Sequence, residues 1–81
     1  MYCIEWNTGA GNEWIDGILE KAMQVADDNA AYTQQAIEIF DEDMELVARR
    51  AWCSTTEFIE ENENPIRFGT FGYYADWSFN F

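Results

Sequence analysis

The chain contains no histidine, so it lacks the side chain that most often moves protons near neutral pH. Ser/His and Cys/His nucleophile pairs and imidazole metal sites are excluded for the same reason. Cys3 and Cys53 remain as possible nucleophiles. Arg50 lies close to Cys53 in sequence and its charge can lower a thiol pKa, but a reactive cysteine normally also needs a base or a helix N-terminus. We therefore interpret both cysteines as small structural residues and predict no catalytic residue.

Acidic residues are the other group with chemical potential, and the densest run is "DEDME", which begins at Asp41. Asp41, Asp43 and Glu45 superficially match the start of a calcium-binding loop. That loop needs glycine at its sixth position and glutamate at its twelfth, where this chain has Leu46 and Trp52. We predict no dedicated metal site, and a weak, nonspecific Mg²⁺ or Ca²⁺ site on the clustered carboxylates stays open.

Glycosidase chemistry and nucleotide binding also lack the residues that they need. A glycosidase holds two carboxyl groups about 5 to 9 Å apart in a cleft, whereas Glu60 and Glu61 are neighbours in an acidic, polar run. The glycines of "TGAG" and "FGTFG" match neither GxxxxGK[ST] nor GxGxxG. The sequence therefore predicts a protein that is not an enzyme and that uses no cofactor.

Composition favours one small folded domain spanning residues 1–81, because 48% of the residues are hydrophobic and 17% are aromatic. The first residues lack a basic region followed by an apolar run, and no apolar run approaches the roughly 20 residues of a membrane span. We expect a soluble protein in the cytoplasm of a bacterial host, with Cys3 and Cys53 reduced and unpaired.

Sequence periodicity predicts the elements that position these residues. "YCIEWN" alternates like a half-buried strand, with Ile4 facing one way and Cys3 the other, and "NEWIDG" is interpreted as a short second strand ending at Gly17. Apolar residues at helical spacing predict a helix over residues 18–28.

The second half of the chain is predicted to begin with a β-hairpin. Residues 36–40 and 44–51 alternate as antiparallel strands, with the acids after Phe40 at the tip. A short helical turn is expected in "STTEFIEENEN" before Pro65, followed by a strand over residues 66–70 and an aromatic tail. The predicted fold is α+β: a small antiparallel sheet in roughly ββαββ order, covered by one main helix, with an aromatic C-terminal segment packed along it.

Charge is the most one-sided feature of the sequence, with 16 acidic and 4 basic residues and a formal net charge of −12. Such a charge repels nucleic acid and anionic membranes and steers a protein toward basic surfaces. The acids fall along the predicted helix (Asp16, Glu20, Asp27, Asp28), at the hairpin tip and before Pro65. Solubility alone is the alternative explanation for them.

Aromatic residues gather at the C-terminal end, where seven of the fourteen lie among the last sixteen residues: Phe68, Phe71, Tyr73, Tyr74, Trp77, Phe79 and Phe81. We expect Phe68, Phe71 and one of Tyr73 or Tyr74 in the core. The surplus rings are predicted to anchor a partner or to form a homodimer seam.

The chain also resembles a known class of protein. Its small size, missing histidine, −12 charge and rows such as "DEDMELV" and "EFIEENENP" resemble the short acidic inhibitors that phages and mobile elements encode against bacterial restriction and CRISPR nucleases. "YTQQAIEIFDED" and "NPIRFGTFGYYADW" are similar to short phage-type reading frames. This anti-CRISPR or anti-restriction resemblance implies direct blockade of a DNA-binding nuclease complex, without indicating which one.

Two hypotheses for function follow. The first is an acidic inhibitor that binds the basic nucleic-acid channel of a defence nuclease as a partial DNA mimic. The alternative is a structural or adaptor module that dimerises or docks through its aromatic C-terminal segment. The predicted partner-binding residues are Asp41, Glu42, Asp43, Glu45, Glu57, Glu60, Glu61, Glu63, Tyr74 and Trp77.

Overall fold

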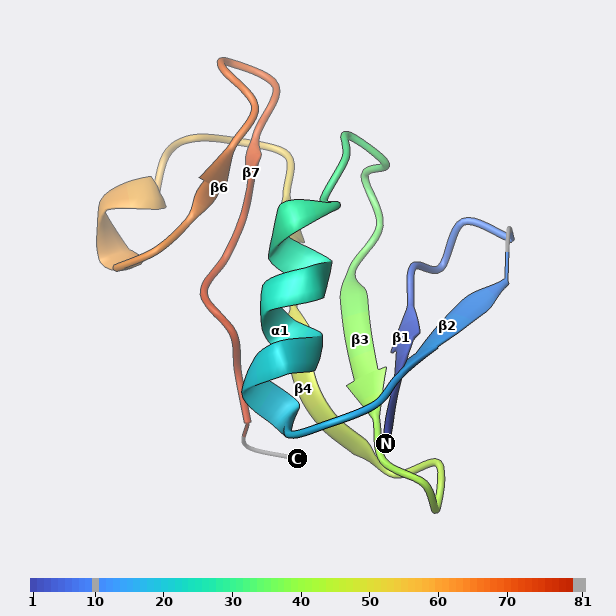
Figure 1. Cartoon of the computed structure of the whole chain (residues 1–81). Coiled ribbons are helices and arrows are strands. Elements are labelled where there is room, and N and C mark those ends of the chain that lie inside the picture. The colour runs from blue at the N-terminus through green and yellow to red at the C-terminus, as the bar shows by residue number, and fades with distance from the viewer. Residues whose placement is uncertain (10, 80–81) are drawn as a thin grey trace.

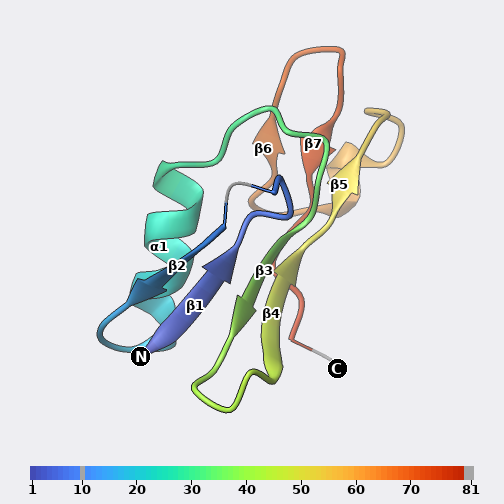
Figure 2. The same ribbon diagram turned by 90° about the vertical axis from the view of Figure 1, so that its right-hand side faces the viewer.

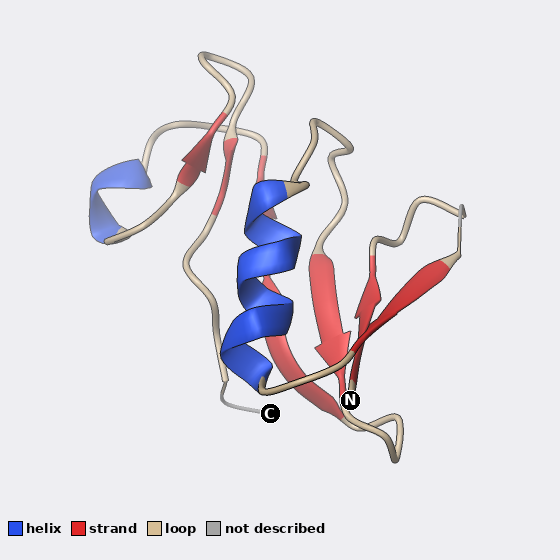
Figure 3. Ribbon diagram, in the orientation of Figure 1, coloured by secondary structure: helices blue, strands red, loops and turns tan. Residues whose placement is uncertain are grey.

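The computed structural model describes residues 1–9 and 11–79 and contains one α-helix and two antiparallel sheets (Figures 1 and 3). In chain order the elements are β1 (Tyr2–Glu5), β2 (Asn12–Ile15), α1 (Leu19–Asp28), β3 (Ile37–Phe40), β4 (Leu46–Arg50), β5 (Trp52–Cys53), the 3-10 turn η1 (Ile59–Glu61), β6 (Ile66–Arg67) and β7 (Tyr73–Tyr74). The predicted α+β class with one main helix is confirmed. Among the described residues, no helix has the length and apolar character needed to cross a membrane.

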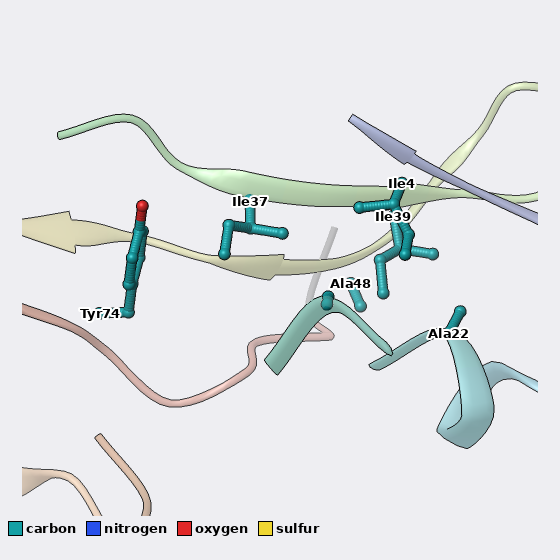
Figure 4. Close-up of a cluster of buried hydrophobic side chains, with 7 residues drawn as sticks. Ile4, Ala22, Ile37, Ile39, Ala48 and Tyr74 are labelled. Carbon is teal, nitrogen blue, oxygen red and sulfur yellow. The ribbon is translucent and has the colours of Figure 1, made fainter. Parts of the chain in front are cut away.

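The larger sheet has the strand order β2-β1-β3-β4, and α1 packs against β1 and β3 on one face (Figure 1). Ile4 pairs with Ile39, and Ile39 pairs with Ala48, so these three side chains form a row on that face. Ala22 and Ala26 of α1 are fully buried against them (Figure 4). Their small side chains let the helix approach the isoleucines closely.

The opposite face of this sheet is turned toward the viewer in Figure 2, and no helix lies over it. Cys3 lies on it between its cross-strand neighbours Trp14 and Phe40. Although this face is open, Cys3 is fully buried, which agrees with its interpretation as a structural residue. Glu5, Glu38 and Arg49 form a second cross-strand row, in which Arg49 Nε lies 3.8 Å from a Glu38 carboxylate oxygen.

The predicted hairpin is confirmed, because β3 and β4 pair antiparallel on either side of the acidic loop. The helix also matches, beginning one residue after the predicted start. The predicted second strand is shorter than expected, since β2 ends at Ile15, and β6 stops at Arg67 because a turn begins at Phe68. The prediction of one sheet is incomplete: β5, β7 and β6 form a second sheet in that order.

A buried arginine connects the two sheets. Arg50, at the end of β4, is 2% exposed, and its Nε donates to Asp27 Oδ1 at 3.0 Å. Its Nη1 and Nη2 donate to the carbonyl oxygens of Ala75 (2.6 Å) and Asn64 (2.9 Å). Trp77 completes the group, because its indole N–H donates to Asp27 at 3.0 Å and the guanidinium lies 5.5 Å from its ring centroid. The helix, β4 and the C-terminal segment therefore share one cation.

Gly72 fixes the turn between β6 and β7 against β5. Its φ is 141°, and a Cβ added there would lie 2.1 Å from the Cys53 carbonyl oxygen. Gly69, in the same turn, also has a positive φ (63°), but no atom lies within 4 Å of an added Cβ. Alanine at position 72 would therefore add both backbone strain and steric overlap, whereas alanine at position 69 would add backbone strain alone.

We expect Gly72→Ala to lower the free energy of unfolding by about 3 kcal/mol, because it adds both strain and overlap with β5. Gly69→Ala is the matched control and should cost about 1 to 2 kcal/mol, from the left-handed backbone alone. Urea denaturation of both variants measures the difference. Equal losses would contradict the close approach of Gly72 to β5.

Candidate protein-binding surfaces

The acidic loop between β3 and β4 is held by one of its own carboxylates. Asp41 Oδ1 accepts the backbone N–H groups of Asp43 at 2.9 Å and Glu45 at 3.0 Å. The Asp41 N–H donates to the Glu45 carbonyl, and the Met44 N–H donates to the Asp41 carbonyl, each at 3.0 Å. Asp41 therefore carries a negative charge and also fixes the backbone conformation of the loop.

The other acids of this loop point into solvent. Glu42, Asp43 and Glu45 are exposed, and none of them forms an ion pair with a lysine or arginine side chain. Glu42 lies 3.2 Å from the exposed Met1 amino group, a contact of the solvated kind that contributes little. Among the described residues, the loop thus presents three exposed carboxylates without a lysine or arginine partner, and an exposed Met44 side chain, on a fixed backbone.

The second predicted acidic row lies elsewhere. Glu57, Glu60, Glu61 and Glu63 are all exposed around η1. Figures 1 and 2 both place η1 in the upper half of the molecule and the β3–β4 loop at its lower end. The connection from β2 to α1, which carries Asp16, lies in the lower half with the loop. The loop and the start of α1 therefore lie in one half of the molecule, and the acids around η1 lie in the other half.

Tyr74 is not available to a partner, and its assignment as a binding residue is wrong. It is fully buried, and its hydroxyl lies 2.8 Å from Thr33 Oγ1 and donates to the Ala31 carbonyl at 3.0 Å. β7 is the central strand of the smaller sheet, and the Tyr74 ring is covered by the side chains of Trp52 and Phe68 and belongs to the hydrophobic core. Trp77 is half-buried and bound to Asp27, and its use as an anchor stays a prediction.

The expected core of the C-terminal segment needs correction as well. Tyr73 and Tyr74 are both buried, where one was expected, and Phe71 is 66% exposed, where it was expected inside. Phe68 is half-buried and packs against the core. Phe81 lies outside the described residues.

An aromatic cluster at the upper end was not predicted, and it joins three distant parts of the chain. The ring centroid of Tyr32 lies 5.4 Å from the centroids of Trp52 and Phe71 and 5.8 Å from that of Phe68. Trp52 and Phe68 also pack against Tyr74, at 5.1 and 5.8 Å. Sequence reasoning placed the aromatic surface in the C-terminal segment alone and missed Tyr32 and Trp52.

The buried charged groups of the hollow beside Arg50 are already engaged in hydrogen bonds. It has a volume of about 260 Å³ and is lined by residues that include Arg50, Asp76 and Trp77. The Asp76 carboxylate accepts the N–H groups of Glu63 and Asn64, both at 2.7 Å. Within residues 1–9 and 11–79, every buried side-chain nitrogen and oxygen has a hydrogen-bond partner, and no group of three His, Cys, Asp or Glu residues is placed to hold a metal ion.

The chain matches no protein-family model, no curated protein and no solved structure.

Thiol reactivity tests the placement of the cysteines. We expect two free thiols in denatured protein, because both cysteines are unpaired. In folded protein, burial and then the charge of Glu5 raise the pKa of the Cys3 thiol, so Cys3 should react at least about tenfold more slowly than half-buried Cys53 with a disulfide reagent at pH 8. A Cys53→Ser variant retains only Cys3, so it should react with the slow phase alone and assign that phase to Cys3. Absence of free thiols, or equal rates for both, would contradict this placement.

Proposed function

We propose that the protein is a non-enzymatic ligand for a basic, nucleic-acid-binding protein, which it contacts through the acidic β3–β4 loop. The observation that carries this proposal is the loop itself, in which Asp41 fixes the backbone and Glu42, Asp43 and Glu45 remain exposed without a basic side-chain partner. A preorganised group of carboxylates loses little conformational entropy when it binds, which favours association.

Electrostatics gives the class of partner. Among the described residues, two ion pairs join acidic to basic side chains, Arg49–Glu38 and Arg50–Asp27, so most of the 16 acidic side chains have no basic side-chain partner. A channel lined with lysine and arginine to hold DNA, which carries about one phosphate per 1.7 Å of helix axis, is the complementary surface. The resemblance to phage-encoded inhibitors supports a bacterial defence nuclease as the owner of that channel.

The arrangement of the acids limits the mimicry. Because the carboxylates around η1 and those of the β3–β4 loop lie far apart in both views (Figures 1 and 2), they do not form one continuous row of phosphate-like charges. In this proposal the loop enters a basic channel, and the other acids, including those at the start of α1, contribute long-range attraction.

A second candidate function is an adaptor that docks through aromatic residues. The exposure of Phe71 (66%) and Tyr32 (44%) favours it, because large exposed rings in contact with each other are typical of an interface. It does not compete with the first, since the aromatic cluster and the acidic loop lie at opposite ends of the molecule.

Neutralising the loop tests the first proposal. In the triple variant Asp41→Asn, Glu42→Gln and Asp43→Asn, the new Asn at position 41 keeps an oxygen that can accept both loop N–H groups, so the fold should persist. We expect association with the basic partner to slow by about tenfold at low salt and the salt dependence of binding to weaken, because charged rims act mainly on the rate of association. Surface plasmon resonance measures both, with a partner recovered by pull-down from bacterial lysate.

The matched control removes the same charge from the other acidic group, as Glu57→Gln, Glu60→Gln and Glu61→Gln. It should change the association rate less than the loop variant, and duplex DNA should compete with the wild-type protein for the partner. Unchanged affinity and salt dependence in the loop variant would remove this loop from the binding surface.

A further inference from the structure

Three of the uncharged segments of this chain span residues 29–37, 51–56 and 68–75. The segments contain aromatic residues among Ser, Thr, Gln, Ala and Gly. Aromatic enrichment with depletion of charge is the composition of the centre of a protein–protein interface.

The fold brings these three segments together at one end, which we name the charge-free end. Tyr32, Trp52 and Phe68, one from each segment, are in mutual ring contact at 5.4 to 5.8 Å. The Ala75 N–H donates to the Ala51 carbonyl at 2.9 Å, and the Tyr74 hydroxyl donates to the Ala31 carbonyl at 3.0 Å. In Figures 1 and 2 the β6–β7 turn and the loop from α1 to β3 both lie at the top, away from the β3–β4 loop.

Two aromatic rings of this end are exposed and pack against each other. Phe71 is 66% exposed and Tyr32 is 44% exposed, and their ring centroids lie 5.4 Å apart. Thr70 and Gln35, in the same segments, are also exposed. The end therefore presents an apolar pair to solvent beside uncharged polar residues.

We propose that the charge-free end binds a second copy of this chain. Two molecules that each carry −12 repel each other, and contact through the β3–β4 loop, the η1 region or the start of α1 would bring carboxylates together. Contact through the charge-free ends keeps the β3–β4 loops and the starts of α1 of the two copies apart, whereas the η1 acids lie in the same half of each molecule as the contact. This contact is also self-complementary, as a two-fold interface requires, since Phe71 of each copy can pack beside Tyr32 of the other.

Dimensions are compatible with such a contact. A standard interface buries about 800 Å² on each partner, which is a modest part of the 5110 Å² surface of this chain. The molecule is 36 Å long, so end-to-end contact keeps the acidic loops much farther apart than the screening length of about 8 to 10 Å. The dimer would present two acidic loops facing outward, and its formation does not depend on the proposed function.

Sedimentation equilibrium over a concentration series tests the proposal at about 50 mM and about 500 mM NaCl. We expect the mass to rise with concentration toward twice the 9.5 kDa of one chain, with tighter association at high salt, because salt screens the repulsion between two anionic bodies. Binding of a basic partner through the acidic loop has the opposite salt dependence, so failure of one proposal is distinguishable from failure of the other.

Substitutions that add a charge test which surface forms the dimer interface. Phe71→Glu should weaken dimerisation by at least about 100-fold, because like charges apposed in an interface are strongly repulsive. Thr70→Glu adds a charge to the same turn without removing a ring, so it gives the test even if Phe71→Glu disturbs folding, which circular dichroism will show. The control is Ile18→Glu, which adds the same charge at an exposed residue. Ile18 lies at the start of α1, away from the charge-free end. This variant should dimerise within about threefold of wild type, since distant charges are screened.

A mass that stays at one chain at both salt concentrations would overturn the proposal, even if the charge-free end were found to bind a different protein. Dimerisation that survives both Phe71→Glu and Thr70→Glu at wild-type strength would also overturn it, because another surface would then form the contact.

Discussion

One buried guanidinium determines how the two sheets of this protein are joined. Arg50 leaves the end of β4 and binds the helix through Asp27 and the C-terminal half through the carbonyls of Asn64 and Ala75. A buried charge is tolerated only when it is paired and fully hydrogen-bonded, and removal of one partner typically costs about 3 to 5 kcal/mol. The smaller sheet has strands of only two residues, so it depends on this arginine and on the aromatic cluster.

The consequence is a molecule with two different ends. β4 continues directly into β5, so the large sheet carries the acidic loop at one end and supports the charge-free aromatic end at the other (Figure 2). One end is suited to steer toward a basic surface, and the other can be buried against a neutral one. Because the two surfaces lie at opposite ends, one molecule can use both at the same time.

The periodicity of the sequence predicted most of the strands and the helix. The burial of the C-terminal aromatic residues depends instead on long-range strand pairing, which the sequence does not show. The alternation around Ile37 and Ile39 and the helical spacing of Ala22 and Ala26 depend on neighbours in sequence, and both predictions are confirmed. The aromatic tail has no period, so the burial of Tyr74 and the exposure of Phe71 depend on pairing with a strand some twenty residues away, which no local signal reveals.

The importance of Arg50 was nevertheless readable, because it lies two residues after Ala48 and therefore on the inward face of β4. The absence of charge around Tyr32 and Trp52 was an equally visible signal for the aromatic end. Native-state amide hydrogen exchange on Arg50→Met, with exposed Arg49→Met as the control, tests most directly whether Arg50 joins the two sheets. If Arg50 joins the two sheets, the Ala75 amide, which is bonded to Ala51 between them, loses protection by at least about 100-fold in Arg50→Met, and loses more than the amides of β1 and β3. Wild-type protection at Ala75 in that variant would contradict this role of Arg50.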